Sequence, residues 1–433
     1  MGTFDGVMDA YPAAPRQGKT ILYFYHNCKF PDWQPRYNVY EYRILQVLCK
    51  NYDVVVAFFA RSWTRRPHKG IIPGDARFVL VPDLPLPKCL PRILGWALET
   101  AARIIRIALL VRIIRPDLVY ANWIPRDSGF CCGRAGVHPL VAAAWGSDIQ
   151  IEARKSSILR FFAKLTVRSA DAVVVDSEVQ REAVFSFGCS PSKVCCFPWG
   201  IDLDRFRPQD SLQARQELGW ISNRIVVSTR KHSSLYGVEY LIRAMPRILE
   251  SVKDARFLIV GAGPLLDYHK SLVRQLGIQE TVRFLGYVDN GQLPKILNAA
   301  DVYVSTSFSD GSSASLMEAL GCGLPVVVTD IPGNKEWIND GENGFLVPPG
   351  DGLALAVCIV RLLQEGELRL RMRQANLTLA RKKADWKTNS LVLERCIDRL
   401  ILSASRAAGR FDTQSESAKL TSSSEAIGHD EAK

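Results

Sequence analysis

Residues Ser305–Gly323 read STSFSDGSSASLMEALGCG, and this stretch with its two flanks predicts the fold class. An apolar strand is expected before it, over Val302–Ser305, and another after it, over Pro325–Val328. Between these strands Asp310 opens a loop of small residues, and a helix is expected to begin near Ser315. A strand, a helical crossover and a second strand predict neighbouring parallel strands in one sheet.

The same alternation of apolar strands and amphipathic stretches extends along the chain in two series. In the first half, the predicted strands are Ile21–Tyr25, Asp53–Phe58, Leu118–Ala121, Leu140–Ala144 and Ala172–Val175. In the second half, they are Arg224–Ser228, Phe257–Val260, Val282–Phe284, Val302–Ser305 and Pro325–Val328. We therefore predict an α/β protein with two Rossmann-like, doubly wound domains that face each other across a ligand-binding cleft.

The length of 433 residues also favours two domains over one core. We predict a first domain over residues 19–200 and a second over 201–384, joined by the Pro- and Gly-containing linker FPWGIDLDRFRP. An apolar stripe predicts a final helix over residues 385–404 that docks back on the first domain; its members are Leu391, Leu393, Cys396, Ile397, Leu400 and Ile401. Residues 1–18 and the polar segment 405–433 are expected to be disordered.

The charge balance restricts the partners. Lys and Arg outnumber Asp and Glu by 55 to 44, a net charge of +11, which favours phosphates, nucleic acid or an acidic membrane surface. The 11 cysteines are scattered without a CxxC pair, as in a cytosolic protein with reduced thiols. Neither a signal peptide nor an apolar run long enough to span a bilayer is evident, so a cytoplasmic location is expected.

The loop and helix start after Ser305 have the properties of an anion site. Backbone N–H groups at a helix start can bind phosphate without a metal. Asp310 and Glu318 would repel phosphate, so hydroxyls of a sugar or a ribose are their plausible targets. Arg230 ends another predicted strand, and its guanidinium can offset the charge of a diphosphate. The residues alone thus predict a site for a nucleotide-linked sugar.

The longer stretch SDGSSASLMEALGCGLPVVVTDIPGNKEWINDGENGFLVPPGD resembles the signature of the family-4 retaining glycosyltransferases, also called glycosyl transferases group 1, which have the GT-B fold. The likeness runs from about Ile21 to Leu402. The family has an acidic residue, seven others and then Glu; here Asp310 replaces the first Glu, and Glu318 is the second. The resemblance implies a hexosyltransferase-type enzyme (EC 2.4) of polysaccharide or glycoconjugate biosynthesis, with a nucleotide-diphosphate sugar as co-substrate and with no metal and no other cofactor.

The resemblance also implies residue roles. Glu318 would bind the donor ribose, Asp310 the transferred sugar, and Arg230 the leaving diphosphate, whose phosphate can take the acceptor proton, so that no protein base is needed. Relatives usually have a Lys at the position of Tyr236. The implied donor-binding residues are Lys231, Tyr236, Gly261, Gly263, Gly286, Tyr287, Gly311, Ser312, Ser313, Ala314, Ser315 and Leu316.

The first domain would hold the acceptor, a glycan or a lipid-linked molecule, at strand ends that include Trp123, Trp145, Asp148 and His26. Trp145 stands where many relatives have His, so it cannot act as a base; it can stack on a sugar ring or pack in the core. Asp148 can bind an acceptor hydroxyl or cap the next helix. His26, a lone histidine, is more often structural.

Residues Leu90–Ile114 predict a basic amphipathic helix with Arg92, Glu99, Arg103 and Arg106 on one narrow face. Such a helix could lie with its arginines on an anionic membrane surface, which would make the protein peripheral on the inner face of the membrane. It could instead pack against its own sheet with the arginines in water.

Three other functions are weaker. A dinucleotide-dependent dehydrogenase would need G-x-G-x-x-G after its first strand, where this chain has HNCKF. A metal-dependent transferase could use Asp202 and Asp204 as a metal-binding D-x-D pair, but these aspartates lie in the linker. A non-catalytic partner subunit that binds a sugar nucleotide or docks on a membrane remains the alternative, because Tyr236 and Trp145 replace familiar functional types. No nucleic-acid partner is expected.

Overall fold

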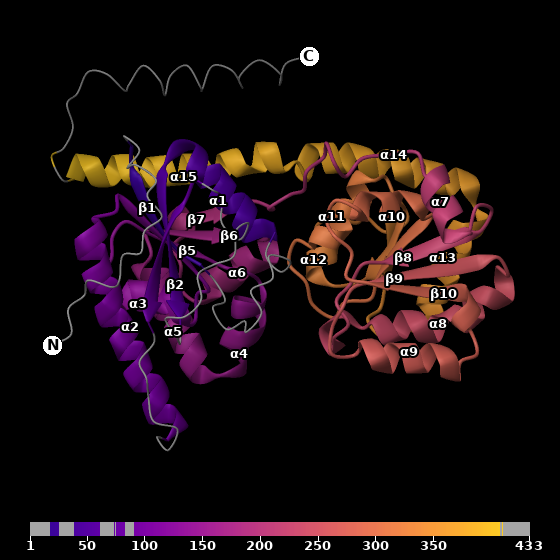
Figure 1. The fold of residues 1–433 in the computed structure, drawn as a ribbon, viewed down its shortest axis with the longest axis horizontal. Helices are drawn as coiled ribbons and strands as arrows, with labels where there is room; N and C mark the ends of the chain where they lie inside the picture. Colours follow the sequence, from indigo (N-terminus) through magenta and orange to yellow (C-terminus); the bar gives the residue numbers. More distant parts are fainter. Residues whose placement is uncertain are drawn as a thin grey trace, which may run out of the picture.

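Two α/β domains lie side by side in the structure, which is a computed structural model (Figure 1). It describes residues 18–25, 39–60, 73, 75–82, 91–407 and 409. Each domain is built on one parallel sheet with helices on both faces, which confirms the predicted fold class.

The sheet of the first domain has the strand order β3-β2-β1-β4-β5-β6-β7, all parallel. Its strands are β1 (Thr20–Phe24), β2 (Asp53–Ala60), β3 (Arg77–Pro82), β4 (Leu118–Asn122), β5 (Leu140–Ala143), β6 (Ala172–Val175) and β7 (Val194–Cys196). The helices are α1 (Val39–Asn51), α2 (Arg92–Ile114), α3 (Asp127–Arg134), α4 (Ala153–Lys155), α5 (Ser157–Ser169) and α6 (Glu178–Ser186), with short turns η3 (Asp148–Glu152) and η4 (Pro191–Lys193).

The second sheet has the order β10-β9-β8-β11-β12-β13, again parallel. Its strands are β8 (Arg224–Ser228), β9 (Ala255–Val260), β10 (Val282–Gly286), β11 (Val302–Ser305), β12 (Val326–Thr329) and β13 (Gly344–Val347). The helices are α7 (Leu212–Leu218), α8 (Val238–Ser251), α9 (Leu266–Gln275), α10 (Leu293–Ala299), α11 (Ala314–Gly321), α12 (Pro332–Lys335), α13 (Gly352–Gln364) and α14 (Gly366–Lys383), with turns η5 (Ser234–Tyr236) and η6 (Gln279–Thr281).

The central strands are the ones that the sequence predicts best. Every residue of β4, β6 and β11 is buried, as expected for central strands covered on both faces, and these strands read as continuous apolar runs. The strands β3, β7 and β13 were not predicted. All three lie at sheet edges, although the fourth edge strand, β10, was predicted.

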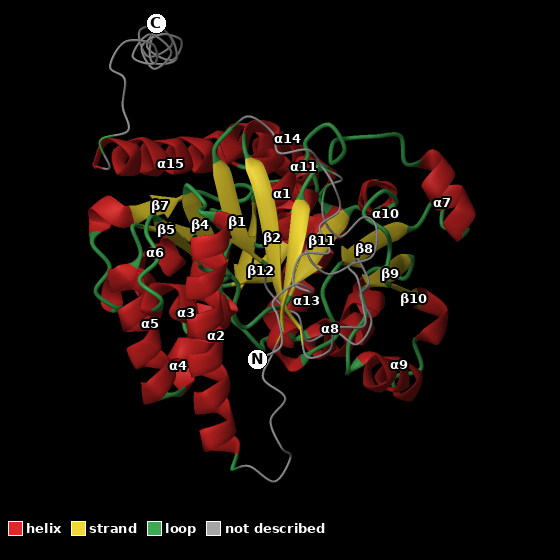
Figure 2. Cartoon of the chain, turned by 60° about the vertical axis from the view of Figure 1, so that its left-hand side comes forward, coloured by secondary structure: helices red, strands yellow, loops and turns green. Residues whose placement is uncertain are grey.

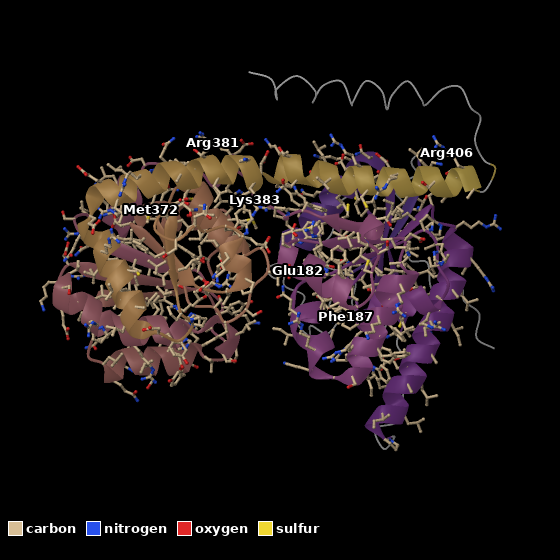
Figure 3. The ribbon with its side chains drawn as sticks, turned by 180° about the vertical axis from the view of Figure 1, so that it is seen from behind. Glu182, Phe187, Met372, Arg381, Lys383 and Arg406 are labelled. Carbon is tan, nitrogen blue, oxygen red and sulfur yellow. The ribbon has the colours of Figure 1, made fainter. Side chains whose placement is uncertain are left out.

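The chain crosses between the domains twice at one place. Ile201 pairs with Asp385, and Gly200 packs so closely that a Cβ there would lie 2.8 Å from the Ala384 carbonyl oxygen. After this crossing α15 (Trp386–Ala407) runs over the first domain, while α14 lies over the second (Figure 3).

Helix α15 packs on β4, β6 and β7 and on α1. Leu393, Cys396 and Ile397 are buried against the first sheet, and Tyr52 donates a 2.6 Å hydrogen bond to Asp398. Leu391 is 44% exposed, so it does not belong to the buried stripe. The helix ends three residues after the predicted residue 404, and the predicted disordered ends fall almost entirely outside the described residues.

Helix α2 packs on its own domain, as one of the two sequence-based alternatives expects, but Arg103 does not point to water. Arg103 packs over the Phe59 ring at 4.8 Å and donates a 2.9 Å hydrogen bond to Glu99, so it faces the domain and not water or lipid. The C-terminal half of the helix is anchored by buried side chains such as Ile107. Its first turns extend beyond the rest of the domain (Figures 1 and 2), and there Ile93 is 83% exposed.

Candidate donor and acceptor site

The site lies where parallel strands end and the chain connections diverge. β8 and β11 are central neighbours in the second sheet, with crossovers leading away in opposite directions, a topological switch point. Arg230 follows β8 by two residues, and the loop that carries Asp310 follows β11. The topology therefore brings together two motifs that lie eighty residues apart in the sequence.

The Arg230 guanidinium is the centre of this site and is 7% exposed. It forms a short ion pair with Asp310 and donates to the hydroxyls of Ser313, at 2.7 Å, and Ser315. Burial acts to lower the pKa of Arg230, but the Asp310 carboxylate outweighs burial and raises it. The cation is thus fixed in place before any ligand binds.

The Tyr236 ring covers the guanidinium. The Arg230 Cζ atom lies 4.3 Å from the ring centroid, a cation–π geometry. Tyr236 therefore limits the positions that Arg230 can adopt. Lys231, the neighbouring cation, is exposed to solvent.

The start of α11 is the predicted anion site. Ser313 is its N-cap, but its hydroxyl accepts from Arg230 and makes no side-chain cap bond. The first N–H groups of a helix lack partners within the helix, so those of Ala314, Ser315 and Leu316 are available to a ligand in this geometry. The Leu316 side chain itself is fully buried in the core.

Two of the predicted glycines, Gly261 and Gly263, pack against the loop that carries Arg230. A Cβ at Gly261 would lie 2.4 Å from the Arg230 carbonyl oxygen, and one at Gly263 would lie 2.3 Å from that of His232. The GAGP loop therefore lies directly on the segment that carries Arg230. Gly286 has a φ of 64° with open space around it, and Tyr287 beside it is 38% exposed.

Glu318 lies on α11 within the field of two cations. Burial raises the pKa of its carboxyl group to about 7, while Arg43 of α1 and Arg230 oppose the shift. The Glu318 side chain is half-buried. At pH 8 the carboxylate is available as an acceptor for hydroxyl groups.

Asp148 is fully buried and supports the acceptor-side loops instead of facing a ligand. Its carboxylate accepts N–H bonds from Trp145 (2.9 Å), Ile149 (2.9 Å) and Ile124 (3.1 Å). Burial raises its pKa to about 6, and these backbone bonds limit the rise. Trp123, between these loops, has a φ of 70°, a strained value for a bulky residue, and its indole donates to Glu152 at 3.3 Å.

The Trp145 indole is held from two sides. It donates a 2.9 Å hydrogen bond to Asn122 and stacks on the buried Trp199 with the ring centroids 6.0 Å apart. Asn122 in turn donates to the Phe24 carbonyl oxygen and, at 3.2 Å, to the buried Glu41. The Trp145 ring is therefore held by core packing, which is one of the two interpretations that the sequence allows.

The last predicted residues are His26 and the linker pair Asp202 and Asp204. His26 lies outside the described residues. Asp204 forms an exposed 2.6 Å ion pair with Lys387, and Asp202 accepts from the Asp204 N–H in a local turn. In the part of the chain that the structure describes, no three His, Cys, Asp or Glu side chains gather as a metal site.

Comparison with known proteins identifies the class. Residues 212–378 match glycosyl transferases group 1, and residues 38–200 match the glycosyl transferase 4-like domain. The chain therefore belongs to the group 1 glycosyltransferases, and its two domains form the GT-B fold. This confirms the family that the stretch around Asp310 resembles.

Particular relatives extend the comparison. A phosphatidyl-myo-inositol mannosyltransferase of Mycobacterium leprae is 31% identical over 210 residues, which cover 48% of this chain and 54% of that protein. The chain spans about half the length of several such curated relatives. A GDP-mannose-dependent alpha-(1-6)-phosphatidylinositol monomannoside mannosyltransferase of Mycolicibacterium smegmatis is 28% identical over 268 residues, 59% of this chain and 69% of that protein.

Solved structures share the fold at low identity. HepE of Anabaena, in complex with UDP and glucose, aligns with a TM-score of 0.69 and 21% identity over 88% of this chain and all of that chain. A sucrose-phosphate synthase from Thermosynechococcus elongatus aligns with a TM-score of 0.72 and 18% identity over 89% of this chain and all of that one.

Three polar residues of the first domain that lie beside the site were not predicted from the sequence. Asn122 accepts from the Trp145 indole and donates to Glu41, and the Asp176 carbonyl oxygen accepts from the Ser312 hydroxyl. Asn122 ends β4 and Asp176 follows β6, so a polar residue directly after a buried strand was an available signal. Glu41 lies in the first turn of α1 and carries no such signal.

Proposed function

We propose that this protein transfers a sugar from a nucleotide-diphosphate donor to a glycan or lipid-linked acceptor, with retention of configuration at the sugar carbon and without a bound metal. The observation that carries the proposal is the buried Arg230, fixed between Asp310 and the helix start at Ser313 and Ser315. A fixed cation beside free helix N–H groups is arranged for a diphosphate.

In this arrangement Arg230 and the first N–H groups of α11 bind the diphosphate, while Asp310 and Glu318 accept hydroxyl bonds from the sugar and the ribose. The acceptor oxygen attacks the sugar carbon on the face from which the phosphate oxygen departs. The new carbon–oxygen bond forms as the old one breaks, and the leaving phosphate takes the acceptor proton. Arg230 stabilises the growing charge electrostatically, so the chain supplies no covalent nucleophile.

A lipid surface is the proposed working environment. Exposed apolar side chains gather on the first turns of α2 and on α5, namely Ile93, Leu94, Trp96, Leu98, Ile158 and Phe161. Trp96 stacks on Phe162 of α5 at 5.5 Å, which joins the two helices. Exposed basic residues Arg154, Lys155 and Arg160 border this apolar patch and suit anionic lipid. None of the helices in the described part of the chain has the length and apolar character of a membrane span.

The test is donor turnover by the purified chain. UDP-sugars and GDP-sugars are the first donors to offer, because similar proteins are named for UDP complexes and for GDP-mannose. Turnover should persist in EDTA, and NMR of the product should show the donor's anomeric configuration. Activity that is lost in EDTA and restored by manganese, or an inverted product, would contradict the mechanism. A chain that binds donors but turns over none would instead support the partner-subunit alternative.

A further inference from the structure

The donor loop of the second domain touches the first domain at Asp176. Asp176 directly follows β6 and is 8% exposed. The Ser312 hydroxyl donates to the Asp176 carbonyl oxygen at 2.6 Å, and the Ser312 N–H reaches the Asp176 carboxyl group at 3.4 Å. The loop beside Asp310 therefore gains a hydrogen-bonded support from the opposite domain.

Gln180, one turn into α6, completes this support. Its amide nitrogen donates to the Asp176 Oδ1 atom, and its amide oxygen accepts from the Asp176 N–H at 3.3 Å. A Cβ at Gly311 would lie 2.7 Å from the Gln180 Nε2 atom and 2.9 Å from the Asp176 Oδ1 atom. The Gly311 backbone thus lies directly against this pair, and a side chain there would push the domains apart.

A second contact fixes the same face. The Val179 N–H at the start of α6 donates to the Glu336 carboxylate, which follows α12, at 3.1 Å. Helices α6 and α12 pack together across the domain boundary. The contact at Asp176 is therefore part of an interface and not an isolated bond.

We propose that Asp176 is a positioning residue for sugar transfer: from the first domain it holds Gly311 and Ser312 in place when the domains are together. The inference rests on the proposed function, in which these two residues belong to the donor loop. Asp176 acts through the loop and need not touch the substrate.

The surroundings of the Asp176 carboxyl group favour its protonated form. The titratable groups that face Asp176 from packed elements are Asp310, on the loop after β11, Glu336, after α12, and the Cys196 thiol, at the end of β7. Ser177 and Gln180 of its own segment are polar and uncharged. Burial raises the pKa of Asp176 to about 7, Asp310 and Glu336 add to the rise, and hydrogen bonds from Ser312 and Ser177 oppose it.

This environment makes domain contact depend on pH. With the domains apart, Asp176 would return to water and to an ordinary pKa of about 4. Closing the domains then takes up a proton between about pH 4 and pH 7, so the closed arrangement weakens as pH rises through this window and stays weak above it. Asp176→Asn keeps the shape of the neutral group and should remove the dependence.

Small-angle X-ray scattering of the full chain at pH 5.5 and pH 8 tests the proposal without turnover. The radius of gyration of the unmodified protein should increase at pH 8, and that of Asp176→Asn should not. Glu178→Gln removes one charge from the same helix at an exposed residue and should follow the unmodified protein. An identical pH response in Asp176→Asn and the unmodified protein would overturn the proposal.

Turnover supplies the second arm. We divide kcat/KM for the donor in Asp176→Asn by the value in the unmodified protein, and expect this ratio to rise about tenfold between pH 5.5 and pH 8. Glu318 titrates in both proteins, so its effect cancels in the ratio. Asp176→Ala should raise the donor KM more than it lowers kcat, because the loop loses its support. Equal effects of Asn and Ala at both pH values would overturn the proposal. Absence of turnover in the unmodified protein would refute the proposed function, while scattering would still decide the role of Asp176.

Discussion

At the scale of single residues, the site depends on how Arg230 is held. A guanidinium can serve Asp310, Ser313 and Ser315 at once because its donors are fixed in a plane, which a lysine ammonium cannot imitate. Tyr236 covers the face of that plane. The Tyr236 ring is therefore a second restraint on Arg230.

Tyr236 should matter through its ring and not through its hydroxyl. Tyr236→Phe should keep donor affinity within about twofold, whereas Tyr236→Ala should weaken it about fivefold to thirtyfold, as expected for a loss of roughly 1–2 kcal/mol of cation–π interaction. Calorimetric titration with UDP or GDP measures both. Equal affinities of the Ala and Phe variants would show that the ring does not restrain Arg230.

Single residues also show where sequence reasoning reached its limit. Asp310, Arg230 and Glu318 could be chosen because each occupies a position with a local meaning, such as a strand end or the first turns of a helix. Asp148 could not be assigned, because its three N–H partners come from two loops that only the sheet brings together. Gly261 and Gly263 were predicted to allow a close backbone approach, and in the structure the approaching backbones are those of Arg230 and His232.

At the scale of elements, a buried histidine pair joins α9 to the loop after β8. His232 and His269 are 0% and 1% exposed, and their Nδ1 atoms lie 2.7 Å apart. Burial, His269 and Lys270 lower the pKa of His232 to about 4, and burial also lowers that of His269. Both rings are therefore neutral near pH 7, and the Nδ1–H of one ring donates a hydrogen bond to the Nδ1 atom of the other.

Acid should destabilise the second domain through this pair. Between about pH 6.5 and pH 4 these histidines are protonated in the unfolded state but stay neutral in the folded state. Their contribution to the free energy of unfolding is therefore fully present above pH 6.5 and is lost as pH decreases. We expect a loss on the order of 2 kcal/mol between pH 7.5 and pH 4.5 by urea unfolding, which His232→Asn should reduce. Equal stability at both pH values would contradict this account.

The apolar patch on α2 and α5 leads to a vesicle experiment. The protein should float with phosphatidylglycerol vesicles, and release by salt should be incomplete because apolar side chains insert. Ile93→Asp combined with Phe161→Asp should abolish flotation. Ile221→Asp is the matched control in the second domain, since Ile221 is also exposed, at 52%. Flotation of the double variant like the unmodified protein would contradict the patch as the contact surface.

The central strands were the elements predicted best from the sequence. Central strands such as β6, β8 and β11 were predicted with their observed bounds, because helices cover both of their faces. The edge strands β3, β7 and β13 were missed, whereas the fourth edge strand, β10, was predicted although its residues are only half-buried, so an edge position alone does not account for the misses. For α2 the amphipathic pattern was visible, but the face turned to the domain was not, because Arg103 packs on Phe59 through its flat guanidinium.

At the scale of the whole molecule, the crossing at Ile201 and Asp385 ties the domains together. Gly200→Ala should destabilise the protein by about 1–3 kcal/mol, because the residue has a φ of 77° and its Cβ would meet Ala384 and Trp386. Gly219→Ala is the control, since Gly219 has a similar φ of 68° but open space around it. Chemical unfolding of both variants separates the cost of the positive φ, which both share, from the cost of the close contact, which only Gly200→Ala has. An equal loss in the free energy of unfolding would show that the close contact contributes nothing.

The central claim is that Arg230, held by Asp310 and the start of α11, binds the nucleotide diphosphate without a metal. Calorimetric titration of UDP and GDP in EDTA tests it most directly, with Arg230→Ala beside Arg224→Ala, an exposed arginine at the opposite end of β8. The account predicts binding by the unmodified protein and by Arg224→Ala, and an affinity about tenfold to hundredfold weaker for Arg230→Ala, as for the loss of a charged hydrogen-bond donor worth roughly 1.5–3 kcal/mol. Unchanged affinity in Arg230→Ala, or binding by the unmodified protein only after manganese is added, would contradict it.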